Sequence, residues 1–305
     1  MSYHIVSIDA ANCSLSCRDG QLTCRTAEGE RRLPLEDVAS IIITSWSAQI
    51  HSHLLLQAAK HGVALILCEA FKPTSLVLPA NRSTDTLLSR ALLRLPPRVR
   101  ADLWQKTVDA KCTNQLTLAQ QLAPTHPALE ALQLGAASGH THKEALCART
   151  FWKIMGGVLG DNGFTRRRDG GGLNALLNYG YAVLLSTVLQ KLFGVGLDPT
   201  WGIAHAPRER ATPLAYDLME PFRPCVDWRV VQWVRDHPAP EGQTVTPAYR
   251  HWAAMLPLLH THHRGHSMEI HTAIETVVRS FRHAVREGRA RYYQPWTPTE
   301  TQCAG

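Results

Sequence analysis

The chain has 305 residues, of which 45% are hydrophobic and 19% are charged, a composition that excludes a largely disordered protein and leaves room for two domains. The formal net charge of +7 arises after residue 80, because residues 1–80 carry six Lys or Arg against seven Asp or Glu. Any surface that binds a polyanion is therefore expected in the second part. A basic protein with no nucleic-acid role accounts for the charge alone equally well.

The eight cysteines include no Cys-x-x-Cys pair, which argues against a zinc ribbon. The chain begins Met-Ser-Tyr-His, without the leader typical of secreted proteins, so we expect reduced cysteines and a cytoplasmic protein. The longest apolar stretch, Leu173–Leu197, contains Asn174, Asn178 and Lys191. Those polar groups favour a central helix of a folded domain over a membrane span.

The first 80 residues have the pattern of a small β-rich domain. Short apolar or alternating runs predict four strands, then a helix and a buried strand, at His4–Ile8, Cys13–Cys17, Gln21–Thr26, Val38–Thr44, His51–His61 and Val63–Leu67. Asp19-Gly20 and Glu28-Gly29 supply the turn residues that hairpins need.

Helical periodicity dominates after a Pro-, Asn- and Ser-containing linker at residues 78–86. Helices are predicted at Leu87–Leu95, Pro97–Leu122, His142–Leu159, Gly172–Phe193, Thr246–His260 and Met268–Tyr293, with Thr141 and Ser267 as N-caps. The expected fold class is therefore α+β, with a β-rich N-terminal domain at residues 1–80 and a larger all-α domain at residues 87–305.

Asp217 and Glu220 lie three residues apart, so on a helix both carboxylates point the same way and repel unless a cation neutralises them. Pro221 and Pro224 are expected to limit how far that helix continues. An isolated pair of this kind is usually only a solvated face. With His205 and a further carboxylate, however, it would form a mixed oxygen and nitrogen site suited to magnesium or manganese.

Glu144 is the candidate for the further carboxylate. It lies in a predicted helix whose next turn carries Phe151 and Trp152, two residues expected in the core. The spacing allows Glu144 to face inward. A surface glutamate that favours the helix dipole is an equally good interpretation of the pattern alone.

Three separate blocks carry a family resemblance: Gly172–Ala182, Gly196–His205 and Asp217–Pro224, the last reading Asp-Leu-Met-Glu-Pro-Phe-Arg-Pro. Their order and intervals resemble the core of CRISPR-associated protein one, most closely the versions that accompany type II systems. That family inserts captured spacers into CRISPR arrays as part of antiviral defence. The chain departs from related sequences at Ala204, where a second histidine is common.

The resemblance implies a metal held by Glu144, His205 and Glu220, with Asp217 beside it to orient His205 or to accept a second cation. The implied cofactor is magnesium or manganese. The implied reaction is a transesterification in which a DNA 3′-hydroxyl attacks a phosphodiester. Two rivals stay open: a metal-dependent endonuclease that cuts branched or single-stranded DNA, and a non-catalytic DNA-organising protein.

The implied partners are double-stranded DNA, as spacer precursor and CRISPR repeat, a second copy of the chain through the N-terminal sheets, and CRISPR-associated protein two. A type II system adds its RNA-guided effector nuclease. Candidate phosphate contacts are Arg149, Arg166, Arg167, Arg168 and Arg223. The last predicted helix adds a weaker arginine face.

The histidine cluster at His260–His266 could bind zinc or nickel, but it has no Cys or acidic partner at a fitting spacing. The simpler interpretation is a polar loop between two helices.

Overall fold

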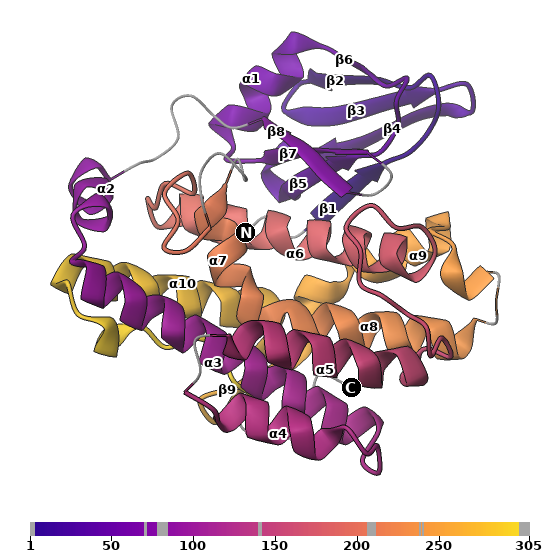
Figure 1. Ribbon diagram of the computed structural model, residues 1–305. Coiled ribbons are helices and arrows are strands. Elements are labelled where there is room, and N and C mark those ends of the chain that lie inside the picture. The colour runs from indigo at the N-terminus through magenta and orange to yellow at the C-terminus, as the bar shows by residue number, and fades with distance from the viewer. Residues whose placement is uncertain are drawn as a thin grey trace.

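The structure is a computed structural model, and it describes residues 4–69, 72–77, 85–139, 142–205, 212–237, 239 and 241–298. Its strands come mainly first and its helices after them. Figure 1 shows the β-rich part on one side of the long central helix α6 (Leu173–Gly194) and most of the other helices on the opposite side. The predicted α+β class, a β-rich N-terminal region followed by a helical domain, is confirmed.

Two four-stranded sheets make up the N-terminal part. One has the order β1-β5-β7-β8, in which only β8 is antiparallel to its neighbour, and the other has the order β4-β3-β2-β6. The elements are β1 (His4–Ile8), β2 (Ser14–Arg18), β3 (Gln21–Thr26), β4 (Gly29–Pro34), η1 (Leu35–Asp37), β5 (Val38–Ile43), β6 (Gln49–Ile50), α1 (Ser52–Lys60), β7 (Ala64–Glu69) and β8 (Lys72–Val77).

The predicted strands β1, β2, β3, β5 and β7 and the helix α1 are confirmed, whereas β4, β6 and β8 were not expected. Asp19 and Gly20 both have positive φ, 49° and 73°, and make the two-residue turn between β2 and β3. Leu15, Leu35 and Leu54 are fully buried in a core of their own within this region.

The helical part contains both predicted and unpredicted elements. Its elements are α2 (Thr86–Leu93), α3 (Pro97–Leu122), α4 (Leu129–Ala137), α5 (Lys143–Val158), α6, α7 (Pro213–Met219), η2 (Glu220–Phe222), α8 (Arg223–Asp236), η3 (Glu241–Gln243), α9 (Pro247–Ala254), η4 (Leu256–Leu258), β9 (His260–His263), β10 (His266–Glu269), α10 (Ile270–Glu287) and η5 (Ala290–Tyr292). The predicted helices are confirmed to within two residues except Thr246–His260, which ends at Ala254, and Met268–Tyr293, which ends at Glu287. Helices α4 and α8 were not expected.

The hairpin replaces the polar loop that was expected there, so that interpretation was wrong. Arg264 and Gly265 have positive φ and form its turn, and the two strands shorten the helices on either side. Ser267 lies in β10, and the N-cap of α10 is Glu269. Thr141 and most of the predicted linker, residues 78–84, lie outside the described residues, so the domain limits stay a prediction.

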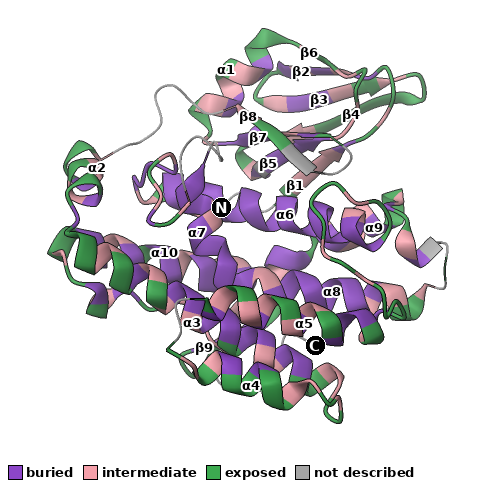
Figure 2. Ribbon diagram, in the orientation of Figure 1, coloured by how far each residue is buried: buried purple, intermediate pink, exposed green. Residues whose placement is uncertain are grey.

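Helix α6 is buried around almost its whole circumference, as Figure 2 shows. The main core extends across it, since Ile42 and Ile66 of the sheet belong to the same cluster as Leu177 and Val188 of α6. The apolar stretch is thus a central helix of a folded core, as expected. Every helix in the described part of the chain is too short or too polar to span a membrane.

Candidate active site

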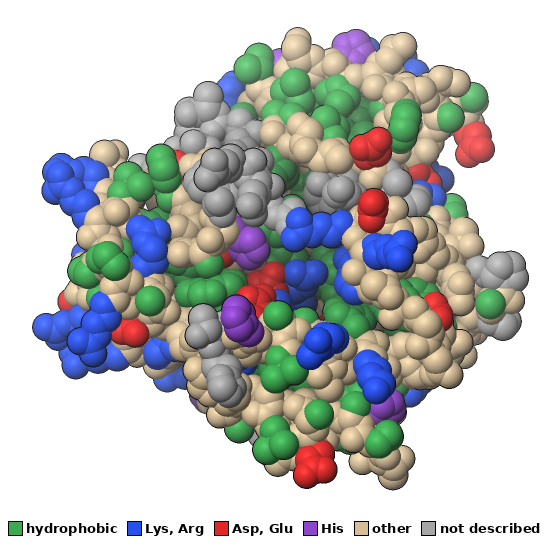
Figure 3. Space-filling model, viewed as in Figure 1, with side chains coloured by type: hydrophobic (Ala, Val, Ile, Leu, Met, Phe, Trp, Pro, Cys, Tyr) green, Lys and Arg blue, Asp and Glu red, His purple; other side chains and the backbone are tan. Residues whose placement is uncertain are grey.

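A pocket of about 250 Å³ opens on the helical part of the molecule. In Figure 3, acidic, basic and histidine side chains meet at a hollow in the middle of the face shown. The lining side chains come from α3, α5, α6, α7, η2, α8 and two loops: Lys111, Glu144, Arg166, Arg168, Asn178, Tyr181, Leu185, His205, Tyr216, Met219, Glu220 and Arg223. The chain fold therefore brings the three predicted metal ligands to one pocket.

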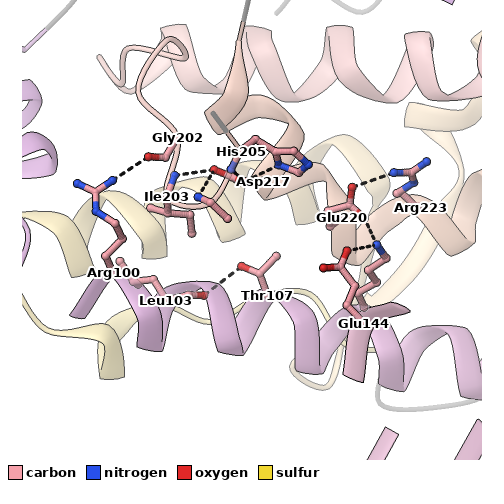
Figure 4. A network of polar contacts seen from close by, with 12 residues as sticks. Arg100, Leu103, Thr107, Glu144, Gly202, Ile203, His205, Asp217, Glu220 and Arg223 are labelled. Atoms are coloured by element: carbon pink, nitrogen blue, oxygen red, sulfur yellow. Dashed lines mark hydrogen bonds and ion pairs between the residues drawn. The ribbon is translucent and has the colours of Figure 1, made fainter. Parts of the chain in front are cut away.

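Glu220 is the most buried carboxylate of the pocket lining, with 3% of its surface exposed. Its Oε1 accepts a hydrogen bond from Arg223 Nη1 at 2.8 Å (Figure 4), and its Oε2 lies 2.5 Å from Lys111 Nζ as an ion pair. Burial opposes ionisation of Glu220, but the charges of Arg223 and Lys111 outweigh it and lower the pKa to about 2. Glu220 is therefore a carboxylate at neutral pH.

The break between α7 and α8 places Glu220. Pro221 ends the regular helix as expected, but the chain makes one turn of 3₁₀ helix and then resumes as α8, with Pro224 in its first turn. Asn114 of α3 donates its amide to the Pro221 carbonyl at 2.8 Å and so ties this turn to α3.

Glu144 lies in the first turn of α5 and faces Glu220 across one lysine. Lys111 Nζ donates to Glu144 Oε1 at 2.7 Å, and the Glu144 side chain is 37% exposed. Glu144 is thus the more accessible of the two carboxylates. Lys111 itself is buried, and its neighbouring carboxylates raise its pKa against the effect of burial.

Asp217 accepts hydrogen bonds from His205, a contact that fits one of the two roles that the family resemblance implied for it. Its Oδ1 accepts from the His205 ring Nδ1 at 2.7 Å and from the His205 backbone N–H at 3.1 Å, while Oδ2 accepts from the backbone of Ile203 and Ala204 (Figure 4). Asp217 is fully buried. A proton on Nδ1 leaves the Nε2 lone pair of His205 available to a ligand.

Gly202 is required by the close packing of this loop. A Cβ atom there would lie 2.8 Å from Asp217 Oδ2 and 2.8 Å from the His205 carbonyl oxygen. Arg100 of α3 donates to the Gly202 carbonyl at 2.8 Å and fixes the loop from the other side. Gly202 thus lets Asp217 reach the backbone that carries His205.

The arginine loop before α6 is held by two asparagines. Asn174 and Asn178 accept from the Arg166 guanidinium at 2.9 and 2.7 Å and also bond the backbone of the loop. Arg166 is therefore a partly buried structural residue as well as a member of the pocket wall. Arg167 and Arg168 are exposed, and of these two only Arg168 lines the pocket.

Arg149 is exposed on α5 and does not line this pocket. Arg166, Arg168 and Arg223, by contrast, line the pocket together with the acidic groups. The predicted role of Arg149 as a phosphate contact is left untested.

A buried network supports the rear of the pocket. Tyr181 donates its hydroxyl to Asp227 of α8, and the Arg223 guanidinium lies 4.2 Å from the centre of the Tyr181 ring. Burial raises the pKa of Asp227 to about 6 despite the opposing effects of Tyr181 and Arg223. This network fixes the arginine that pairs with Glu220.

The donor set of the pocket suits a hard divalent ion, because Glu144 and Glu220 offer carboxylate oxygens and His205 offers an imidazole nitrogen. Among the described residues, however, no three His, Cys, Asp or Glu side chains stand close enough together to hold one ion. That includes the hairpin histidines. In the pocket, Lys111 lies between the two glutamates.

Sequence reasoning missed Lys111, Arg100 and Asp227. The signal for Lys111 was its position on α3, because it follows Thr107 by four residues and precedes Asn114 and Leu118 by three and seven on the buried stripe. A lysine on such a stripe indicates a buried ion pair.

The family model described as CRISPR associated protein Cas1 matches residues 6–245. The CRISPR-associated endonuclease Cas1 of Neisseria meningitidis serogroup C is 33% identical over 222 residues, which are 71% of this chain and 71% of that protein.

Solved structures show the same fold. A casposase bound to integration product has a TM-score of 0.74 at 19% identity and covers 100% of this chain and 96% of its own. A CAS1 protein from Thermotoga maritima has a TM-score of 0.74 at 13% identity, covering 97% and 100%. A chain of a Cas6-RT-Cas1–Cas2 complex has a TM-score of 0.76 at 13% identity, covering 97% of this chain and 36% of that longer one. With its family match, its relative and its fold in agreement, this chain belongs to the CRISPR-associated protein Cas1 family.

Proposed function

We propose that this chain is a metal-dependent DNA integrase that inserts spacer DNA into a CRISPR array. The observation that carries the proposal is the composition of the pocket. Glu144, Glu220 and His205 line it together with three arginines, and Asp217 accepts a hydrogen bond from the His205 ring. The chain's membership of the Cas1 family supports the reaction class. A casposase bound to integration product has the same fold.

Some residues of the pocket would bind the metal ion, and others would bind phosphate. Glu144, His205 and Glu220 would hold a magnesium or manganese ion, which when bound supplies a Lewis acid for phosphoryl transfer. Glu220 stays ionised because of its two cationic neighbours, and Asp217 presents Nε2 of His205. Arg168 and Arg223 place positive charge beside the position of the phosphodiester.

The proposed partners are double-stranded DNA, a second copy of the chain and CRISPR-associated protein two. A Cas1–Cas2 complex among the structures of this fold supports the last of these. The type II resemblance adds an RNA-guided effector nuclease. We also propose that the protein acts in the cytoplasm, where the seven described cysteines, none of which forms a disulfide, would stay reduced.

Strand transfer should depend on the 3′-hydroxyl of the incoming DNA. A labelled duplex with free 3′-hydroxyls is expected to become joined to a repeat-bearing plasmid when manganese and CRISPR-associated protein two are present. The same duplex ending in dideoxynucleotides should give no joined product while binding equally well, because the attacking oxygen is missing.

The plasmid itself provides the opposing result. A hydrolytic endonuclease uses water, so it would cut plasmid equally with either duplex and transfer no label. That outcome would favour a metal-dependent endonuclease over an integrase. The Neisseria relative is named as an endonuclease. Binding without any cutting or joining, unchanged by Glu220→Gln, would favour a DNA-organising protein.

The exposed arginines of the loop should contact phosphates. Replacing Arg167 and Arg168 together by alanine should reduce the salt dependence of DNA affinity by up to about two counterions, since each phosphate contact releases about 0.9 ion. The slope of log affinity against log salt measures this. Arg235→Ala on α8 is a control outside the pocket, and an unchanged slope in the double variant would show that the loop does not touch DNA.

A further inference from the structure

Lys111 is the only lysine that lines the pocket in the described part of the chain, and it contacts both candidate carboxylate ligands. Its Nζ lies 2.7 Å from Glu144 Oε1 and 2.5 Å from Glu220 Oε2. The residue is 8% exposed, so solvent screens these contacts little. One positive charge thus joins a carboxylate of α5 to a carboxylate of the turn after α7.

The position of this ammonium follows from rigid packing. Lys111 is in the middle of α3, a 26-residue helix, with the buried Thr107 and Asn114 one turn before and after it. Asn114 bonds the turn that carries Glu220, so the lysine and its acceptor are held together by the same two elements. The contact is therefore built into the fold.

The negative charge of Glu220 can be neutralised without Lys111. Arg223 already bonds its other oxygen at 2.8 Å and is held in place by Tyr181 and Glu220. Glu220 Oε2 faces the Lys111 ammonium at 2.5 Å, so Lys111 is a second cation on a carboxylate that Arg223 already pairs. A structural role in pairing Glu220 is thus already filled by Arg223.

We propose that Lys111 is an internal cation that competes with the divalent ion for Glu144 and Glu220 and so sets the metal affinity of the pocket. The inference rests on the proposed function, because it concerns the ion that the integrase would use. An ammonium and a divalent ion cannot both take the oxygens that Lys111 now contacts. Metal binding through these two oxygens therefore requires the lysine to withdraw, which its flexible four-carbon chain permits.

Competition predicts the opposite effect from a supporting role. Removing a positive charge that lies within 3 Å of both glutamates leaves two carboxylates facing each other with one cation fewer, and their attraction for a divalent ion rises. If Lys111 only organised the pocket, its removal would leave metal binding the same or weaker.

The test is the binding of Mn²⁺ alone to the purified full chain, measured by titration calorimetry and by the electron paramagnetic resonance of free Mn²⁺. Lys111→Met, which keeps the length of the side chain without its charge, should lower the dissociation constant about tenfold or more. Lys111→Gln, which keeps a hydrogen-bond donor, should lower it in the same direction. In thermal unfolding, Mn²⁺ should raise the midpoint of both variants more than that of the wild type.

Two controls make the result specific. Lys191→Met removes a partly buried lysine that pairs with Glu275 at 3.2 Å, outside the pocket lining, and should leave Mn²⁺ affinity within about twofold of the wild type. Glu220→Gln removes a proposed ligand and should weaken binding.

Equal or weaker Mn²⁺ binding by both Lys111 variants, with binding lost in Glu220→Gln, would overturn the competition and leave the proposed metal site standing. No Mn²⁺ binding by any form would overturn both. Failure of both Lys111 variants to fold would also overturn the inference, because it would show that the lysine is needed for the structure itself.

Discussion

Replacing Glu220 by glutamine is expected to reduce strand transfer by about a hundredfold or more, because it removes a charged metal ligand while keeping the shape of the side chain. The change also removes the negative charge shared by Lys111 and Arg223. Leaving two cations without their buried partner should lower the free energy of unfolding by about 3 kcal/mol. Urea denaturation and the plasmid-joining assay measure the two effects separately.

The free energy of unfolding at acid pH provides a second readout for the same variant. The folded-state pKa of Glu220 is about 2, below its ordinary value of 4.5, so its contribution is fully present above pH 4.5 and is lost as the pH falls toward 2. The difference in unfolding free energy between wild type and Glu220→Gln should therefore shrink across that range.

Glu275 offers a matched control on α10. It also pairs with one lysine and one arginine, Lys191 and Arg279, but about a third of its side chain is exposed. Glu275→Gln should cost about 1 kcal/mol or less and leave strand transfer unchanged. Wild-type strand transfer by Glu220→Gln would show that Glu220 is not a ligand.

The elements that the sequence predicted are those whose burial pattern is regular. Helix Pro97–Leu122 and strand Gln21–Thr26 were predicted with their observed limits, because their apolar residues repeat with the period of one element. Strand β4 was missed because it is an edge strand with four exposed residues at its start, Gly-Glu-Arg-Arg. The β9–β10 hairpin was missed because half of its eight strand residues are histidine, and only Arg264-Gly265 marks its turn.

Only part of the site was predicted, because some of its contacts join elements that are far apart in the sequence. The family resemblance implied Glu144, His205 and Glu220, which line one pocket, and it placed Asp217 beside His205, whose ring it contacts. It could not show that Lys111 joins two of the glutamates, because α3 precedes α5 and η2 in the chain by more than 30 residues. Charge pairs of this kind are set by the packing of distant elements, which a single sequence does not specify.

Asp217→Asn is expected to lower strand transfer by about 10- to 100-fold through the position of His205. Four donors, three backbone N–H groups and the His205 ring, point at the two oxygens of Asp217. An asparagine supplies one oxygen and an NH₂ group, so some of these donors would face another donor. The unfolding free energy should fall by about 2 to 3 kcal/mol, the cost of leaving buried polar groups unpaired.

A second buried aspartate separates orientation from stability. Asp198 is 8% exposed and accepts hydrogen bonds from the Thr200 backbone and hydroxyl at 3.0 and 2.6 Å, and it does not line the pocket. Asp198→Asn should also destabilise the protein, yet strand transfer measured well below its unfolding midpoint should stay near that of the wild type. Mn²⁺ affinity should fall only in Asp217→Asn, because only that change disturbs the tautomer of His205. If both variants lose activity in proportion to stability, with Mn²⁺ affinity unchanged, Asp217 serves the fold of the loop and does not position the histidine for a metal.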